Sequence, residues 1–193
     1  MRFYADKEKD ICTEIMAWSG HTLQKPNPYY NGLPPCPYAK QAWMEQKVSL
    51  MFKYEPSYQV LYTSVSQFDD NFDLTIIVDV NYQKNAEDFH DYLHKLNVCI
   101  SEGMFIDRDV WLMGFHPEDE PNDFVADPSD VFEPVIEQEY AMIFVQRLSK
   151  LQESADKLEK KGYYKPYEQD YNAKELFSYR NQLYRRLKNG DAS

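Results

Sequence analysis

The segment LTIIVDV, residues 74–80, constrains the fold more than any other part of the chain. An unbroken run of β-branched and apolar residues is typical of a strand that is buried on both faces, in the middle of a sheet. Three further segments have strand character, at 48–54 (VSLMFKY), 110–116 (VWLMGFH) and 140–148 (YAMIFVQRL). The last also fits the buried start of the following helix, and we favour the strand.

Helical periodicity separates these strands. The clearest helix covers 85–103, where Asn85 is placed as N-cap and Gly103 as C-cap. Other helices are predicted at 8–23, directly after Pro37, at 149–161 and at 172–188. The alternation fits no simple parallel sheet, so we expect an α+β fold with a four-stranded, mostly antiparallel sheet of the ferredoxin-like sandwich type.

The length of the chain, 193 residues, suits one core of ordinary size. We therefore expect a single α+β domain over 1–162. The remainder, 163–193, is predicted to be an aromatic-rich connector and a C-terminal amphipathic helix that packs on the domain. The segment 117–139 carries nine acidic and no basic residues, whereas 157–188 carries nine basic residues and four acidic ones.

Charge and hydropathy exclude several classes of protein. A net charge of −11 argues against general nucleic-acid binding, because the mean field repels phosphates. No apolar run reaches eighteen residues and the first residues are charged, so neither a membrane span nor a signal peptide is expected. Three widely spaced cysteines, an odd number, predict free thiols in a reducing compartment. We expect a cytoplasmic protein whose partner is a small molecule or another protein.

Cys36 is the first candidate for chemistry, because LPPCPYA sets it between prolines just before a helix. Unpaired N–H groups at a helix N-terminus lower the pKa of a thiol and increase its thiolate fraction. Cys36 would then be a nucleophile or a metal ligand. The alternative is a compact side chain that holds the loop against a core.

The second candidate is the motif FHPEDE, which follows a predicted strand directly. His116 would act as general base or metal ligand, with Glu118 or Asp119 orienting its ring. The alternative is a solvated proline turn. Thiol chemistry would need Cys36 and His116 to meet, which the sequence does not establish.

The third candidate is the pair His90 and His94, whose spacing of four places both imidazoles on one side of a helix. Together with Glu87 and His116 they would form a site for iron or zinc. The alternative is that both histidines simply face water at the edge of the apolar stripe.

Several of these motifs follow Trp18 in a fixed order: LPPCPYA, LTIIVDV, AEDFHDYL and FHPEDEPNDF. In this order they resemble the bacterial family catalogued as domain of unknown function 1415, over residues 11 to about 155, and the composition suggests a phage-borne member. The resemblance supports Cys36 and His116 and implies no activity. It departs from the family in the insertion TLQKPNPYYNG, in the acids after His116, and in His90 and His94, which the family lacks.

Two functions follow from these observations. The first is a thiol-dependent or metal-assisted enzyme with a pocket between Cys36 and His116. The second is a non-enzymatic acidic adaptor that binds other proteins, in which Cys36 is structural.

Overall fold

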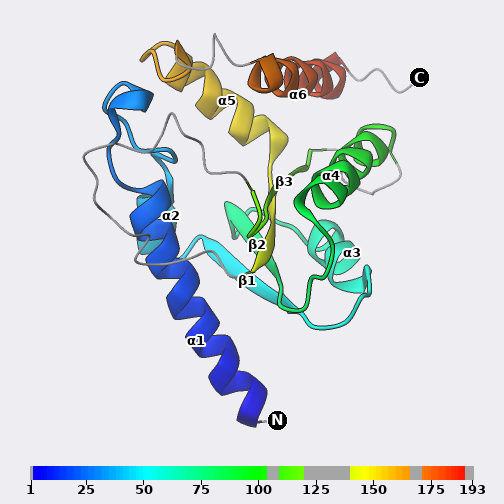
Figure 1. Ribbon diagram of the computed structural model, residues 1–193. Helices are drawn as coiled ribbons and strands as arrows, with labels where there is room; N and C mark the ends of the chain where they lie inside the picture. The colour runs from blue at the N-terminus through cyan, green and yellow to red at the C-terminus, as the bar shows by residue number, and fades with distance from the viewer. Residues whose placement is uncertain (1, 104–108, 120–139, 166–170, 190–193) are drawn as a thin grey trace.

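The computed structural model describes residues 2–103, 109–119, 140–165 and 171–189, and the order of its elements can be followed in Figure 1. The elements are α1 (Arg2–Trp18), the π-helical turn η1 (Ser19–Leu23), the short turn η2 (Pro28–Tyr30), α2 (Ala39–Met44), β1 (Val48–Lys53), α3 (Gln59–Ser66), β2 (Leu74–Asp79), α4 (Ala86–Ser101), β3 (Trp111–Phe115), β4 (Ala141–Gln146), α5 (Leu148–Glu159) and α6 (Tyr171–Asn189). The acidic segment singled out above lies outside the described residues from 120 onward.

The four strands form one mixed sheet in the order β1-β2-β4-β3. β1 is parallel to β2, whereas β4 is antiparallel to both β2 and β3. The expected α+β class and four-stranded sheet are confirmed, and two of the three pairings are antiparallel. The ferredoxin-like arrangement is not confirmed, because the edge strand β1 runs parallel to its neighbour. β1, β2 and β3 therefore end at the same side of the sheet, which we call the carboxyl edge.

Helices cover both faces of the sheet, as the apolar run of β2 requires (Figure 1). α3 and α4 pack on one face, in a core that comprises Leu61, Val65, Phe68, Ile77, Phe89, Leu93, Ile100, Val110, Leu112, Ala141, Ile143 and Val145. α1 packs on the opposite face, in a core that comprises Ile11, Ile15, Trp18, Ile76, Val78, Met142 and Phe144. Alternate residues of β2 thus enter opposite cores, since side chains of a strand alternate between its faces.

Most predicted elements are confirmed within a few residues at their ends. Asn85 caps α4, because its side chain accepts a hydrogen bond from the Asp88 N–H, and Gly103 has the positive φ expected after a helix. β4 is a strand, which decides the alternative left open by its sequence. The helix predicted from residue 8 begins at Arg2, and α3 had no predicted counterpart because QVLYTSVS is rich in β-branched residues.

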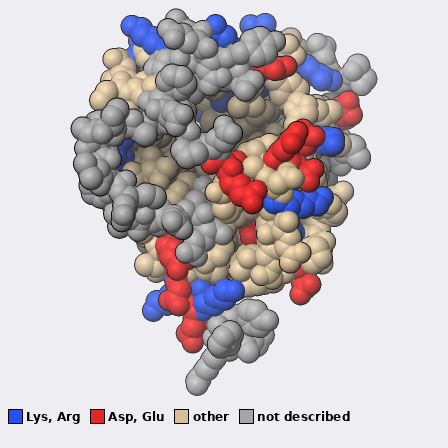
Figure 2. Space-filling view, in the orientation of Figure 1, with Lys and Arg blue, Asp and Glu red and all other residues tan. Residues whose placement is uncertain are grey.

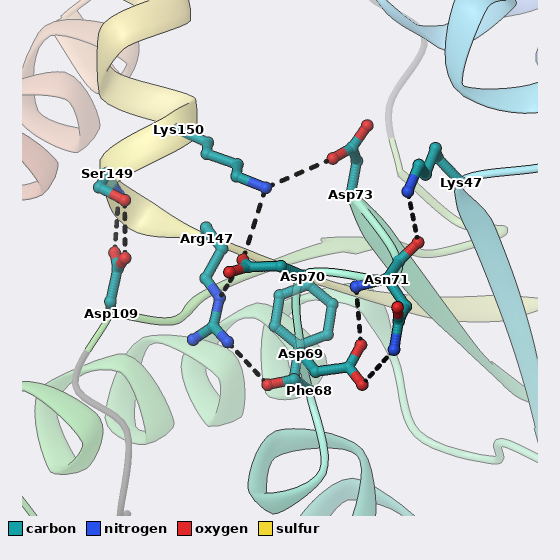
Figure 3. Close-up of polar contacts among 10 residues, drawn as sticks. All are labelled: Lys47, Phe68, Asp69, Asp70, Asn71, Asp73, Asp109, Arg147, Ser149 and Lys150. Atoms are coloured by element: carbon teal, nitrogen blue, oxygen red, sulfur yellow. Dashed lines mark hydrogen bonds and ion pairs between the residues drawn. The ribbon is translucent and has the colours of Figure 1, made fainter. Parts of the chain in front are cut away.

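The start of α5 is fixed by polar contacts at the opposite side of the sheet (Figure 3). The Asp109 carboxylate accepts hydrogen bonds from the backbone N–H and the hydroxyl of Ser149. Arg147 donates to the carbonyl of Phe68 at 2.7 Å and lies over the Phe68 ring. Lys150 forms ion pairs with Asp70 in the same loop and with Asp73. These contacts join α5 to the loop between α3 and β2.

α6 lies against α5 (Figure 1). Leu183 is buried with Trp111 and Leu148, and Arg180 is buried with its Nε donating to the side chain of Gln152. The basic C-terminal helix therefore uses one of its arginines inside the fold. No helix in the described ranges is long and apolar enough to cross a membrane.

The free edge of β3 is closed by one buried side chain. The Asn97 amide donates to the carbonyl of Leu112 and its oxygen accepts from the Leu112 N–H, both at 2.9 Å. The side chain thereby takes the place of a neighbouring strand at that residue. Asn97 projects from α4, so the same contacts also hold α4 to β3.

We expect Asn97→Ala to lower the free energy of unfolding by at least about 2 kcal/mol, because it leaves a buried N–H and a buried C=O without partners. Urea unfolding followed by tryptophan fluorescence measures the change. Asn81→Ala is the matched control, since Asn81 makes a single exposed hydrogen bond to Tyr54 and its loss should cost less than about 1 kcal/mol. Equal losses in the two variants would show that Asn97 does not close this edge.

Candidate functional site

Cys36 lies in the loop between η2 and α2, where it is half-buried. Its backbone N–H donates to the carbonyl of Leu23 at 2.9 Å, and its own carbonyl accepts from the N–H of Ala39. The preceding Pro35 carbonyl accepts a hydrogen bond from the Tyr163 hydroxyl. Contacts from both sides therefore hold this proline-rich loop between the end of α1 and the segment that follows α5.

The activation expected for the Cys36 thiol does not occur. Burial raises its pKa above the ordinary value, and this outweighs the lowering by hydrogen bonds from the backbone of Tyr38 and Ala39. The prediction of a lowered pKa was wrong, because it counted the N–H groups at the start of α2 and not the desolvation of the thiol. Cys36 is therefore mainly a neutral thiol at physiological pH.

His116 lies just after β3 and is buried, with both ring nitrogens engaged. Nδ1 accepts a hydrogen bond from the Glu118 N–H at 3.1 Å, which assigns the proton to Nε2, and Nε2 then donates to the carbonyl of Lys84 at 3.0 Å. The ring contacts those of Tyr82 and Phe89. In this arrangement His116 connects the turn after β3 to the segment that leads into α4.

Asp119 joins the same turn to α4. Its Oδ2 accepts from the His116 backbone N–H and its Oδ1 contacts Nε2 of His90, each at 2.7 Å. Burial raises the pKa of Asp119, but the hydrogen bonds from His90 and His116 and the charges of both outweigh it, so the pKa is lowered overall. Of the two predicted orienting residues, Asp119 binds the ring of His90, not that of His116, and the Glu118 side chain is exposed.

The other histidine of the predicted metal site lies apart from this cluster. His94 is exposed on α4 and its ring contacts that of Tyr179 in α6, 5.1 Å away. Glu87 is exposed in the first turn of α4. Among the residues that the structure describes, no group of three or more His, Cys, Asp and Glu side chains is placed to hold a metal ion.

Cys36 and His116 lie on opposite faces of the sheet. The carbonyl that binds the backbone of Cys36 belongs to Leu23, which packs on the α1 side. The His116 ring contacts Phe89, which belongs to the core under α3 and α4. The structure therefore brings His90, His116 and Asp119 together and leaves Cys36 apart from them.

A second group of residues at the carboxyl edge was not recognised in the sequence. Lys53, the last residue of β1, forms a largely buried ion pair with Asp79, the last residue of β2. Four tyrosines gather near this pair, and we call them the tyrosine cluster: Tyr58, Tyr62, Tyr82 and Tyr92. The rings of Tyr58 and Tyr92 are 5.6 Å apart, and Tyr82 contacts His116, so the cluster is continuous with the histidine turn.

The inner tyrosines of the cluster keep their protons at physiological pH. Burial raises the pKa of Tyr92, with further contributions from the neighbouring tyrosines and Asp79. Burial also raises the pKa of Tyr82, together with the charges of Asp79 and Asp88. Their hydroxyls are therefore neutral groups that both donate and accept hydrogen bonds. Such a surface is suited to recognition and supplies no strong base.

The surroundings of the tyrosine cluster are acidic. The exposed carboxylates on the neighbouring segments are those of Glu55, Glu87, Asp88 and Asp91. The exposed lysines on these segments are Lys84 and Lys95. Figure 2 shows acidic side chains gathered near the middle of one face of the molecule, with basic side chains beside them. A ligand with positive charge is favoured at such a surface.

Part of this site was within reach of sequence reasoning. Tyrosine is unusually frequent, with 16 residues in the chain, and Tyr58 and Tyr62 are four apart. Their spacing carried no meaning without α3, which was not predicted. The meeting of Tyr82 and Tyr92 with α3 depends on the crossover from β1 to β2, and no local pattern encodes that.

Comparisons with known proteins give no relative for this chain. No family model matches it, and neither the search of curated proteins nor the search of solved structures finds a significant match. The resemblance stated from the motifs around Cys36 and His116 therefore stays a prediction.

We expect the Cys36 thiol to react slowly. In a variant with Cys12→Ala and Cys99→Ala, the rate of reaction with a disulfide reagent near neutral pH should be on the order of tenfold below that of the same variant unfolded in urea. The rate should reach half its maximum at a pH above the ordinary thiol value of 9.0. A midpoint below that value would show an activated thiol and restore the nucleophile hypothesis.

We expect acid to remove the stabilisation that Asp119 provides. Its pKa is lowered in the folded chain, so the contribution is present in full above the ordinary value of 3.8 and disappears as the pH falls through the lowered pKa. The difference in unfolding free energy between wild type and Asp119→Asn should therefore shrink as the pH is lowered from about 6 to about 2.

The matched control for this prediction is Glu118→Gln, which removes the neighbouring exposed carboxylate. Its difference from wild type should be within about 0.5 kcal/mol at every pH. A difference for Asp119→Asn that is constant with pH would mean that the ionised carboxylate does not hold the turn.

Proposed function

We propose that this chain is a non-enzymatic protein-binding module, and that its tyrosine cluster binds a positively charged segment of a partner protein. The observation that carries the proposal is the exposure of Tyr58 and Tyr62, each 58% accessible, beside the half-buried Tyr92. Tyrosine offers a large amphipathic surface at a low entropic cost, and it is enriched at protein interfaces.

Two further features support a cationic ligand. Arginine and lysine bind favourably over the faces of tyrosine rings. The carboxylates of Glu55, Asp88 and Asp91 provide attraction over the same region, and the whole chain has a net charge of −11. The ring of Tyr58 is fixed against Tyr92. Part of the surface is therefore ordered before the ligand arrives, which lowers the cost of binding.

The geometry gives less support to an enzyme. Thiol chemistry with His116 as base needs the two side chains in contact, and they pack against opposite faces of the sheet. The raised pKa of Cys36 removes the thiolate that the reaction would use. The half-exposed pair of His90 and Asp119 has the form of an acid–base dyad, yet its bonds equally explain how the turn after β3 is held.

A direct binding experiment tests the proposal. The probe is a fluorescein-labelled octapeptide of alternating arginine and valine, and binding is followed by fluorescence anisotropy at low salt. We expect the double variant Tyr58→Ala, Tyr62→Ala to raise Kd by at least about tenfold, since interface tyrosines commonly contribute more than 1 kcal/mol each. Higher salt should weaken binding to wild type.

Tyr38→Ala is the matched control, because Tyr38 is also exposed but lies beside α2. It should leave Kd unchanged. A peptide with glutamate in place of arginine should bind at least about tenfold more weakly. The proposal is overturned if the arginine peptide does not bind, if the glutamate peptide binds equally, or if both tyrosine variants weaken binding alike.

A further inference from the structure

The two edges of the sheet differ in how their backbone groups are satisfied. At the β3 edge, the outward N–H and C=O of Leu112 are bound by Asn97. At the β1 edge, the direction of each backbone group follows from the pairing with β2. Lys53 is opposite Asp79 and its carbonyl accepts from the Val80 N–H, so the groups of Lys53 face β2. Because directions alternate along a strand, those of Val48, Leu50 and Phe52 face outward.

No hydrogen bond to these outward groups occurs within the described part of the chain. They amount to three N–H donors and three C=O acceptors in a row, which is the template that an added strand needs. The devices that usually block such an edge are weak here. β1 contains no proline, and the charge of Lys53 is paired with Asp79 inside the fold.

Side-chain burial agrees with an edge that is covered incompletely. All six residues of β1 are half-buried, whereas five of the six residues are buried in both β2 and β4. Val48, Leu50 and Phe52 pack towards α1 on one face. Met51 points to the other face, where it contacts Ser64 of α3. The edge of β1 thus lies between α1 and α3, and a strand placed there would find side chains on both faces (Figure 1).

The β1 edge and the tyrosine cluster are adjacent. β1 ends at Lys53, at the carboxyl edge, and Tyr58 begins α3 five residues later. We infer that the cationic segment of the partner binds as an extended strand added to β1, hydrogen-bonded to Val48, Leu50 and Phe52, with its end at the tyrosine cluster. This inference rests on the proposed function and adds the mode of binding.

Charge distinguishes this occupant from a second copy of the chain. Pairing of β1 with β1 of another copy would bring together two molecules with a net charge of −11 each. A cationic segment gains from the same charge. Its arginines also reach the tyrosines and carboxylates next to the edge, whereas its backbone supplies the hydrogen bonds.

Amide hydrogen exchange of the full chain, measured by NMR with and without the arginine–valine octapeptide, tests the inference. In the free chain the amides of Val48, Leu50 and Phe52 should exchange much faster than those of Ser49 and Met51, which face β2. Saturating peptide should slow the exchange of the three outward amides by at least about tenfold. The amides of Ser49 and Met51 should change little.

Two variants sharpen the result. Val48→Pro removes one outward N–H at the first position of the strand, where proline is tolerated, and should raise Kd for the peptide at least threefold. Ser49→Pro removes a hydrogen bond to β2 instead and should chiefly lower stability. The comparison of amides in the wild-type chain does not depend on whether either variant folds.

The possible failures are distinguishable. Peptide binding that depends on Tyr58 and Tyr62 but leaves the exchange of Val48, Leu50 and Phe52 unchanged would overturn strand addition and leave the proposed function standing. Absence of peptide binding would overturn both. Protection of the three amides that rises with protein concentration and needs no peptide would identify a second copy as the occupant and overturn the inference.

Discussion

Burial of β2 on both faces is the constraint from which the rest of the architecture follows. Its alternate side chains enter two different cores, one under α3 and α4 and one under α1. A strand of this kind must have a neighbour on each side, because every backbone N–H and C=O in the interior needs a partner. β1 and β4 supply those neighbours, and the crossover helix α3 then lies over β1 and β2.

This arrangement places the demanding backbone groups at the two outer strands. On β3 the side chain of Asn97 satisfies Leu112, so a polar residue in the middle of α4 has a structural role. On β1 the alternate residues direct their groups outward. The difference between the edges has a physical consequence, since an unsatisfied edge favours the addition of a strand and a closed one does not.

The chemistry suggested by single motifs depends on solvent and on neighbours, and both come from the fold. Cys36 stands before a helix, as its sequence suggested, yet desolvation dominates over the local N–H groups. His116 follows a strand, as its sequence suggested, yet both ring nitrogens bind backbone groups of nearby segments. Asp119 was named as an orienting residue, and it does orient a histidine, but that histidine is His90, 29 positions away.

Most helices and strands could be predicted from the sequence, because apolar periodicity, caps and β-branched runs act over a few residues. Asn85, Gly103 and the run LTIIVDV are examples. α3 was missed, since its burial against β1 and β2 overrides a β-branched composition. The parallel pairing of β1 with β2, the gathering of four tyrosines beside Lys53 and Asp79, and the separation of Cys36 from His116 were decided only by tertiary structure. Each of these brings together or keeps apart residues that are distant in the chain, and the free energy that decides between such pairings comes from burial and hydrogen bonding across the whole fold, not from any local segment.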